Sequence, residues 1–386
     1  MLPATSRHYA EREGRGAHGD TVSEPQTLTL HELNRATLAR QLLLEREPID
    51  PLTAIERLVS LQAQFAKPPY TGLWSRIEDF RRDQLTQLVI ERKVVRATMM
   101  RHTLHLMSAR DFARLRMTIQ PALSRSFGSI AGKRTDGVDL DALVSTARVM
   151  VAESPRTFAE MRKRIAELEP GYDPSALGYA VRSFLPLVQV PSDGHHGFPG
   201  IPRYALAEDF LGAPLASADQ LRELVLRYLA AFGPASVRDA QIWSGLSGLK
   251  QPVDELRSEL TQFRDESGRE LFDLPGAPRP SPDTPAPARL LPDYDNLMVA
   301  HADRTRVVSE DHRRRVSLPA AVVRATFLID GFVAGTWKLE RTAKRATLMI
   351  EPFAKLRRAD RDELSAEAER LLSFLEPELD ADLRFA

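Results

Sequence analysis

The sequence predicts an α+β fold in which three similar units of helices and a β-hairpin are followed by a small β domain with a closing helix. Three observations predict it. A helix-capping pattern recurs three times, each copy is followed by helical segments and a β-prone stretch, and a proline-rich segment separates these copies from a region of apolar strands. A chain of 386 residues is also too long for one ordinary core, so several domains are expected.

The recurring pattern reads Pro-x-[Ser/Thr]-x-x-[Asp/Glu] and begins at Pro51, Pro155 and Pro234. In each copy a hydroxyl is placed to cap a helix N-terminus, and the acid three residues later answers it or favours the positive end of the helix. Capping boxes are common, so the three matches gain weight only from the shared order of elements that follows them. The β-prone stretches after the helical segments are residues 94–107, 187–207 and 263–274.

Helices followed by a hairpin are the order of the winged-helix variant of the helix-turn-helix. The third copy shows the hairpin most directly, because Asp265-Glu-Ser-Gly268 is a turn signal between two apolar segments. We therefore expect three winged-helix units, at residues 27–136, 137–214 and 215–274.

The segments outside the three units differ in texture. Residues 1–26 are polar without a period, so a disordered arm is expected. Residues 275–287 hold six prolines and are expected to be a linker. Residues 288–386 are expected to form a small antiparallel sheet or barrel, with a turn at Asp330-Gly331 and a closing helix from about 360 to 375.

The composition excludes several classes of protein. The absence of Cys removes disulfides, thiolate zinc sites and a Cys nucleophile. No window approaches a membrane span, and the first thirty residues contain no apolar signal core, so a cytoplasmic protein without a membrane partner is expected.

The net charge is zero, with 53 basic and 53 acidic residues, but the charges are unevenly distributed. Residues 91–135 hold ten Lys or Arg against two acids, and the tail from Asp360 holds nine acids against three Arg. Such segregation is often only a solvated helix face. The position of the basic stretch just after two unusual glutamines favours a phosphate-facing surface.

Those glutamines are Gln62 and Gln64. Helical spacing places Gln62 on the same stripe as Ile55 and Leu58 in a helix expected at residues 52–65, so it interrupts an apolar face. Two prolines shortly afterwards are expected to end that helix just past the pair. A buried amide without partners costs about 1–3 kcal/mol, so the pair needs either structural hydrogen bonds or a cleft that uses its donors and acceptors.

Several motifs together resemble the winged-helix DNA-binding family that includes the AlkZ-type DNA glycosylases, over residues of about 29 to 353. The motifs are Leu61-Gln-Ala-Gln64, Arg101-His-Thr-Leu-His105, Gly233-Pro-Ala-Ser-Val-Arg-Asp239 with Trp243, Leu291-Pro-Asp-Tyr-Asp-Asn296 with His301-Ala-Asp-Arg304, and Asp330-Gly331 with Trp337. The resemblance implies three tandem winged-helix units buttressed by a C-terminal β-barrel and a concave basic surface for duplex DNA. It also implies hydrolysis of the N-glycosidic bond of alkylated purines.

The resemblance further implies which residues act. In such glycosylases a Gln-apolar-Gln or Gln-apolar-Asp motif is catalytic, which points to Gln62 and Gln64 here, with a small Ala63 between them. The segment 101–105 is implied to lie against the DNA near the lesion. The residues expected to contact DNA are Arg96, Arg101, His102, Thr103 and His105.

An extended strand at 101–107 is expected to turn Arg101, Thr103 and His105 toward DNA and His102 to the other face. Arg96 and Arg101 are expected to contact phosphate or probe the lesion rather than read bases. A zinc site at His102 and His105 is disfavoured, because the two point apart and no third ligand is evident. We expect neither a metal nor a cofactor.

The chemistry is consistent with two neutral amides. Ordinary glycosidases need an acid for the leaving group, but a purine alkylated at N7 is already cationic and leaves as a neutral base. The carbonyl oxygens of Gln62 and Gln64 then suffice to position a water. We expect a monofunctional glycosylase for N7-alkylated or bulky-adduct purines in duplex DNA, without lyase activity.

Two other functions are compatible with the sequence. A non-catalytic winged-helix regulator or architectural factor is expected to dimerise on half-sites. A protein-interaction scaffold is supported only by the zero net charge. Three units in one chain surround a duplex without a dimer, and this favours a monomeric enzyme.

Overall fold

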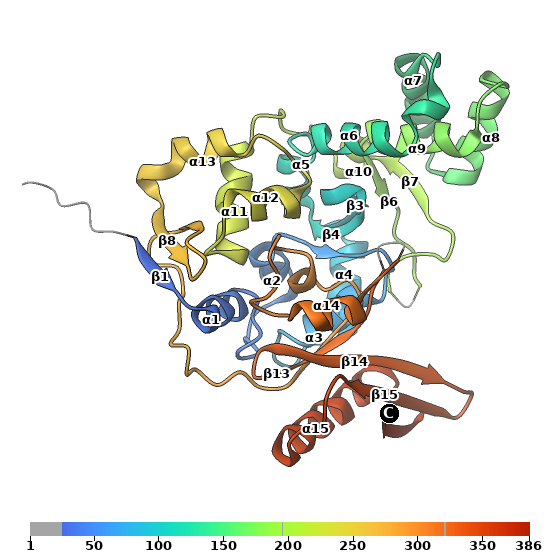
Figure 1. Cartoon of the computed structure of the whole chain (residues 1–386). Coiled ribbons are helices and arrows are strands. Elements are labelled where there is room, and N and C mark those ends of the chain that lie inside the picture. The colour runs from blue at the N-terminus through green and yellow to red at the C-terminus, as the bar shows by residue number, and fades with distance from the viewer. Residues whose placement is uncertain (1–24, 195, 320–321) are drawn as a thin grey trace, which may run out of the picture.

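The computed structural model describes residues 25–194, 196–319 and 322–386, and the expected arm at 1–26 lies almost wholly outside them (Figure 1). Helices and strands alternate along the chain, so the predicted α+β class is confirmed. A short strand β1 (Gln26–Leu28) and helix α1 (Leu30–Arg40) come first. Three segments with one common order of elements follow.

In each segment, which we call a repeat, a helix is followed by a short strand or bridge, two further helices and a hairpin. The first repeat consists of α2 (Pro51–Arg57), β2 (Leu61–Gln62), α3 (Pro68–Trp74), α4 (Arg82–Ile90), β3 (Val94–Thr98) and β4 (Leu104–Ser108). The second consists of α7 (Leu140–Glu153), β5 (Arg156–Thr157), α8 (Phe158–Leu168), α9 (Pro174–Phe184), β6 (Leu187–Gln189) and β7 (Arg203–Leu206). The third consists of α11 (Leu221–Phe232), a bridge at Ala235, α12 (Val237–Ser244), α13 (Lys250–Leu256), β8 (Thr261–Asp265) and β9 (Glu270–Asp273).

The short strand of every repeat pairs with the last strand of its own hairpin. Gln62 faces His105 in the first repeat, Arg156 faces Tyr204 in the second, and Ala235 bridges Phe272 in the third. This common pairing makes the three repeats copies of one topology. The connecting helices are α5 (Ala109–Leu115), α6 (Gln120–Ile130) and α10 (Ala207–Leu211).

The first two hairpins form one sheet. Its strand order is β2-β4-β3-β6-β7-β5, and the two repeats join where Ala97 pairs with Val188. The third hairpin lies in a separate sheet, where β1 adds in parallel to β8. Side chains of the second repeat can therefore reach the first hairpin directly.

The C-terminal part forms a five-stranded sheet covered by α15 (Arg358–Leu375), in the lower part of Figure 1. The strand order is linear, with β10 and β16 outermost, so the expected sheet or barrel is an open sheet. The last strand, β16, runs parallel to β15 and was not predicted. The strands are β10 (Arg289–Leu291), β13 (Thr326–Ile329), β14 (Phe332–Arg341), β15 (Arg345–Pro352) and β16 (Asp380–Phe385).

Short elements between β10 and β13 connect this sheet to the repeats. They are the 3₁₀ turn η4 (Asn296–Met298), helix α14 (Glu310–Val316) and the strand pair β11 (Ser317–Leu318) and β12 (Val322–Val323). The expected linker at 275–287 contains no helix or strand. The predicted turn at Asp330-Gly331 joins β13 to β14, and α1 packs on it. Gly331 has φ +80°, and a Cβ there would lie 2.5 Å from Asn34 Oδ1, so this position requires glycine.

Two of the three predicted caps are confirmed. The hydroxyls of Thr157 and Ser236 each accept the backbone N–H of the acid three residues later, at 3.2 Å. The first copy differs, because Asp50 caps α2 and Pro51 occupies its first turn. Thr53 instead lies inside that helix. An Asp before Pro at the first helical position is an equally good start and takes precedence here.

The predicted helix at 52–65 is wrong. α2 ends at Arg57, Val59 takes φ +66°, and the chain then enters β2. Pro68 and Pro69 begin α3 rather than ending a helix, since a proline lacks only an N–H that the first turn does not need. Gln62 is therefore a strand residue.

A buried ion pair links the first repeat to the C-terminal part. Arg76 donates two hydrogen bonds of 2.9 Å to the carboxylate of Asp295, and both side chains are at most 1% exposed. The remaining guanidinium donors reach the carbonyl oxygens of Gln41 and Gly72, each at 2.9 Å. Asp295 also accepts the N–H of Leu297 at 3.0 Å, so the pair fixes the turn that carries Asn296.

Asp295→Asn should lower the free energy of unfolding by about 3 kcal/mol or more, because Arg76 is left buried without a compensating charge. Urea unfolding followed by circular dichroism measures the change. Asp254→Asn is the matched control, since its ion pair with Lys250 is exposed and should be worth less than about 1 kcal/mol. Equal effects of the two substitutions would contradict the structural role assigned to the buried pair.

Candidate active site

The segment Leu61–Gln64 runs along the edge of the core, with Leu61 and Ala63 inside it and Gln62 and Gln64 directed elsewhere. Leu61 and Ala63 are buried in the apolar cluster that also contains α15 side chains, and the Ala63 N–H donates to Leu104 O at 2.7 Å. Because successive side chains of a strand point to opposite faces, Gln62 projects away from that cluster. The chain turns at Gln64, which is half-buried, and Phe65 after it is exposed.

Gln62 is held from three sides. Its strand pairs with β4, and its N–H donates to Asn296 Oδ1 at 3.2 Å, while Asn296 Nδ2 donates to Ser60 O. Asn296 therefore covers the free edge of the short strand. The side-chain Oε1 of Gln62 accepts a hydrogen bond of 2.8 Å from Arg101 Nη2. Arg101 in turn donates from Nη1 to Trp243 O at 2.5 Å, which connects this site to the third repeat.

Gln64 is held only through its backbone. Its carbonyl oxygen accepts Arg96 Nη2 at 3.0 Å, and the Ala63 carbonyl accepts Arg96 Nε at 2.8 Å. The side-chain Oε1 is buried and has no hydrogen-bond donor among the described residues. A buried acceptor without a donor costs about 1–3 kcal/mol, so this oxygen is poised to take a donor that the protein itself does not supply.

Arg96 is buried, and the DNA contact expected of it stays a prediction. It is 7% exposed, and its Nη1 donates to Gln189 Oε1 at 2.7 Å. The Nε2 of Gln189 in turn donates to Tyr204 OH at 2.9 Å. Burial lowers the pKa of Arg96 to about 10, so it stays charged at neutral pH. Arg96 thus shapes the backbone around Gln64.

The extended strand expected at 101–107 is confirmed only from Leu104, where β4 begins. Arg101 and His102 take φ +54° and +60° in a tight turn, η1 (Met100–His102), that joins β3 to β4. The Met99 N–H donates to Thr103 O at 3.0 Å and closes the turn. Left-handed backbone at two residues without glycine is strained, and such strain is concentrated at functional sites. The turn is what lets Arg101 reach Gln62.

The two histidines of this hairpin point inward. His102 bonds Tyr179 OH and Ser183 Oγ, both at 2.9 Å, and His105 bonds Ser60 Oγ and Thr103 Oγ1, both at 3.0 Å. Burial, with a smaller contribution from Arg182, lowers the pKa of His102 to about 4. Burial and Arg101 place the pKa of His105 well below its ordinary value. Both rings are therefore neutral at pH 7 and brace the hairpin, and the DNA contact expected of them stays a prediction.

Thr103 lies on the same hairpin and is half-buried. Its hydroxyl donates to Met100 O at 3.1 Å and bonds His105. Within the described ranges, no group of three or more His, Asp or Glu side chains is arranged to hold a metal ion.

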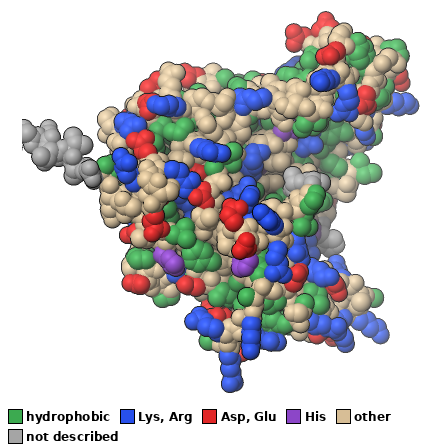
Figure 2. Space-filling model, viewed as in Figure 1, with side chains coloured by type: hydrophobic (Ala, Val, Ile, Leu, Met, Phe, Trp, Pro, Cys, Tyr) green, Lys and Arg blue, Asp and Glu red, His purple; other side chains and the backbone are tan. Residues whose placement is uncertain are grey.

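Basic residues fall into two groups according to their partners. On the face shown in Figure 2, Lys and Arg are interspersed with acids. Many basic residues of the chain form ion pairs, among them Arg110, Arg114 and Arg134. Around the η1 hairpin the described residues give no such partner to a second group. These arginines without a carboxylate partner are Arg96, Arg101, Arg116, Arg182 and Arg304.

The electrostatic consequence is clearest at Arg101. Burial and the nearby charge of Arg304 lower its pKa to about 10, and burial does the same to Arg116. Burial is the main cause of both shifts, and no carboxylate is among their causes. Gln189, Arg182 and Asn296 belong to this region and were missed, because they are distant in sequence and reach the hairpin only through the joined sheet or the 295–297 turn.

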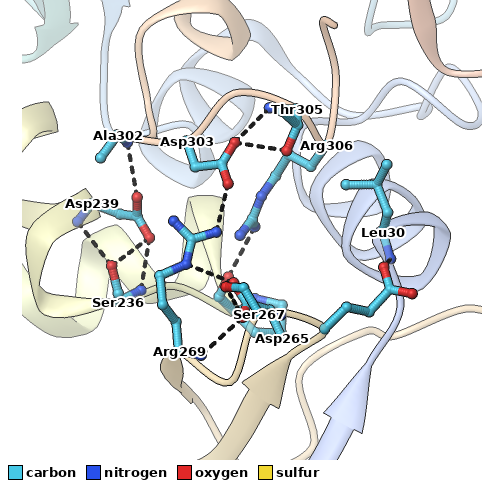
Figure 3. A network of polar contacts seen from close by, with 12 residues as sticks. Leu30, Ser236, Asp239, Asp265, Ser267, Arg269, Ala302, Asp303, Thr305 and Arg306 are labelled. Atoms are coloured by element: carbon cyan, nitrogen blue, oxygen red, sulfur yellow. Dashed lines mark hydrogen bonds and ion pairs between the residues drawn. The ribbon is translucent and has the colours of Figure 1, made fainter. Parts of the chain in front are cut away.

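The loop 301–306 fixes Arg304 by the residues on either side of it (Figure 3). The Ala302 N–H donates to Asp239 Oδ1 at 2.8 Å, and Asp303 Oδ2 accepts Arg269 Nη2 at 2.5 Å. Although burial raises it, hydrogen bonds from Thr305 and Arg269 bring the pKa of Asp303 down to about 2. Asp303 and Asp295 each cap a turn, because each carboxylate accepts the backbone N–H two residues later.

Comparisons with known proteins agree with one another. The family model described as DNA glycosylase AlkZ-like matches residues 55–374. The interstrand DNA cross-link repair glycosylase of Streptomyces sahachiroi is 24% identical over 341 residues, which cover 82% of this chain and 88% of that protein. The solved structure of the Streptomyces sahachiroi DNA glycosylase AlkZ superposes with a TM-score of 0.75 at 19% identity, covering 94% of this chain and 100% of that one.

No helix in the described ranges combines the length and apolar character needed to span a bilayer. The family match extends over most of the chain and includes the glutamine segment, its hairpin and the C-terminal sheet. The chain therefore belongs to the AlkZ-like DNA glycosylase family.

Proposed function

We propose that this DNA glycosylase hydrolyses the N-glycosidic bond of N7-alkylated or bulky-adduct purines in duplex DNA, with Gln62 and Gln64 positioning the attacking water. The observation that carries the proposal is the difference between the two amides: Arg101 fixes Gln62, and the oxygen of Gln64 has no donor. In this proposal the enzyme acts as a cytoplasmic monomer without a metal or cofactor.

The three repeats support a duplex-binding scaffold. Helix, short strand, two helices and a hairpin, with the short strand on the last strand, is the order expected of winged-helix units. We therefore propose three such units, at 27–136, 137–214 and 215–274, with the C-terminal domain at 288–386. Arginines without carboxylate partners around η1 supply charge that backbone phosphates can neutralise.

The reaction needs little from the protein because the substrate is already activated. Water oxygen attacks C1′ of the sugar, the C1′–N9 bond breaks, and its electron pair neutralises the cationic purine. The proton that water loses passes to solvent, since an amide is a poor base. The protein contributes position, which alone is worth several kcal/mol when the reacting atoms are held in contact.

The two amides have different parts in this mechanism. An arginine can only donate, so the atom of Gln62 that faces Arg101 must be its oxygen, and Nε2 is left to donate to the oxygen of the water. No side-chain bond fixes Gln64, and a half-turn of its amide brings Oε1 out of its buried, unpartnered position. Gln64 is then the acceptor that directs a hydrogen of the water. An acid at this second position, as in the Gln-apolar-Asp form of the motif, fits the same part.

The structural alternative is a pair of amides that only bond the backbone. It predicts satisfied side chains at both positions, and the unpartnered Oε1 of Gln64 argues against it. The backbone around Gln64 is already secured by Arg96, so its side chain is not needed for that purpose.

Gln62→Ala and Gln64→Ala should each lower single-turnover excision of N7-methylguanine from a duplex by about 10²-fold or more, because each removes one contact to the water. Cleavage of the resulting abasic site by alkali, resolved on a gel, measures excision. Gln251→Ala is the control, since Gln251 lies exposed on α13 and bonds only Glu255. Unchanged rates in both active-site variants would remove the glutamines from the mechanism.

Replacing each glutamine by glutamate tests which of the two donates a hydrogen bond to the water and which accepts one from it. Gln64→Glu should keep most of the activity, because a carboxylate accepts. Gln62→Glu should lose it by about 10²-fold, since it pairs with Arg101 and has no N–H to offer. The same excision assay measures both. Equal activities of Gln62→Glu and Gln64→Glu, or the reverse order, would refute the donor role of Gln62 and the acceptor role of Gln64. Whether the two glutamines are catalytic at all is decided separately, by the alanine variants.

A further inference from the structure

A large cleft lies apart from the glutamine segment, where the first repeat meets the C-terminal sheet. Its volume is about 880 Å³, within the range of sites for small molecules. None of the residues that surround Gln62 lines it. Its walls come from the segment after α1, the C-terminal end of α3, the start of β10 and helix α15, and the side chains that matter below are Arg46, Trp74, Arg289 and Arg370.

Arg289 is the unusual residue in this cleft. It is 6% exposed, has no carboxylate partner among the described residues, and its Nε is buried without any acceptor. Its two bonds are long, 3.3 Å to Ala288 O and 3.4 Å to Leu44 O. Burial and the charge of Arg46 lower its pKa to about 10. A buried guanidinium with an unsatisfied donor requires an explanation, and an absent anion supplies one.

Two further arginines line the same cleft and share a single carboxylate. Arg46 donates to Glu367 Oε1 at 2.6 Å and lies over the ring of Trp74 at 4.5 Å. Arg370 bonds the other oxygen of Glu367. A second carboxylate, Glu363, accepts the Ala288 N–H at 2.9 Å and also acts on Arg289. Three guanidiniums thus meet two carboxylates, which leaves a surplus of one positive charge around Arg289.

Three acids also line the cleft. Glu45, Glu78 and Asp79 line it, and none of the three forms a side-chain ion pair with a basic residue of the described chain. Acids at this position repel an extended polyanion such as a duplex. The charge arrangement therefore favours a ligand with one compact anionic group, and a phosphomonoester carries about −1.5 to −2 at pH 7.

We propose that this cleft binds a small molecule through a phosphate group, held by Arg289 with Arg46 and Arg370. The guanidinium of Arg289 presents adjacent N–H donors that match two oxygens of a phosphate. Arg46 and Arg370 complete the charge balance while Glu367 keeps them in place. This site is independent of the glycosylase reaction, and its test does not use activity.

Trp74 provides the readout, because it lines the cleft and the other two tryptophans of the chain do not. Titration of the full-length protein with inorganic phosphate, at ionic strength held constant with chloride, should give a saturable change in tryptophan fluorescence. The change should vanish in Trp74→Phe. A response no different from that to chloride would overturn the proposal.

Arg289→Met should weaken phosphate binding by at least about tenfold, since a charge-assisted hydrogen bond is lost, and Arg289→Lys should restore part of it. Arg370→Gln tests the same site without a folding risk, because the side chain is 60% exposed, and should also weaken binding. Arg81→Gln, at the exposed rim and bonded to Asp83, is the control and should bind as the wild type does. Unaltered binding in both Arg289→Met and Arg370→Gln would refute the site.

A DNA-binding measurement on the same variants distinguishes a small phosphate compound from the phosphates of the DNA backbone. Arg289→Met and Arg370→Gln should leave undamaged-duplex affinity and its salt dependence unchanged. A loss of duplex affinity with a salt slope reduced by about 1 would assign the cleft to a backbone phosphate and overturn the small-molecule proposal.

Discussion

Two arginines without carboxylate partners hold the Gln62–Gln64 segment, and the geometry of the site depends on them. Arg96 donates hydrogen bonds to the carbonyl oxygens of Ala63 and Gln64, and Arg101 donates one to the side-chain oxygen of Gln62. A guanidinium can satisfy several acceptors at fixed angles, which a lysine cannot. The arrangement leaves both cations without a carboxylate partner among the described residues.

The shared sheet of the first two repeats explains how Arg96 and Arg101 are held in position. Because β3 of the first hairpin pairs with β6 of the second, Gln189 and Tyr204 reach Arg96 from the neighbouring repeat. Trp243 of the third repeat receives Arg101, and Asn296 from beyond the linker closes the edge of β2. The second and third repeats therefore hold the two arginines that bind residues 62–64, and the C-terminal part bonds Gln62 directly. Residues from all three repeats and from the C-terminal part therefore meet around the short strand β2.

The sequence predicted what local chemistry decides. The caps at Thr157 and Ser236, the hairpin turn at 265–268 and the turn at Asp330-Gly331 depend on residues within a few positions of one another, and all are present. It failed where pairing partners are distant. Residues 58–65 have helical spacing, but pairing with β4 some forty positions later overrides it. The inward turn of His102 and His105 follows from the same long-range pairing.

The net charge of the chain is a poor guide to its local charge. A net charge of zero suggests no affinity for a polyanion, yet several exposed basic residues form ion pairs with nearby acids, whereas five arginines around the η1 hairpin have no carboxylate partner among the described residues. What a ligand senses is the unpaired charge at its own contact surface, not the sum over the chain. The basic segment at 91–135 pointed to the right region, although only some of its members are unpaired.

Neutral amides are the groups that suit such a site. A carboxylate at position 62 would pair with Arg101 and lose its use, whereas an amide bonds Arg101 and still offers an N–H. The reaction proposed here develops positive charge on the sugar, which uncompensated arginines oppose. Backbone phosphates bound at those arginines remove the opposition. Under that mechanism the free enzyme is unsuited to the chemistry until DNA is bound, so the same unpaired charges that attract the duplex also make cleavage conditional on its arrival.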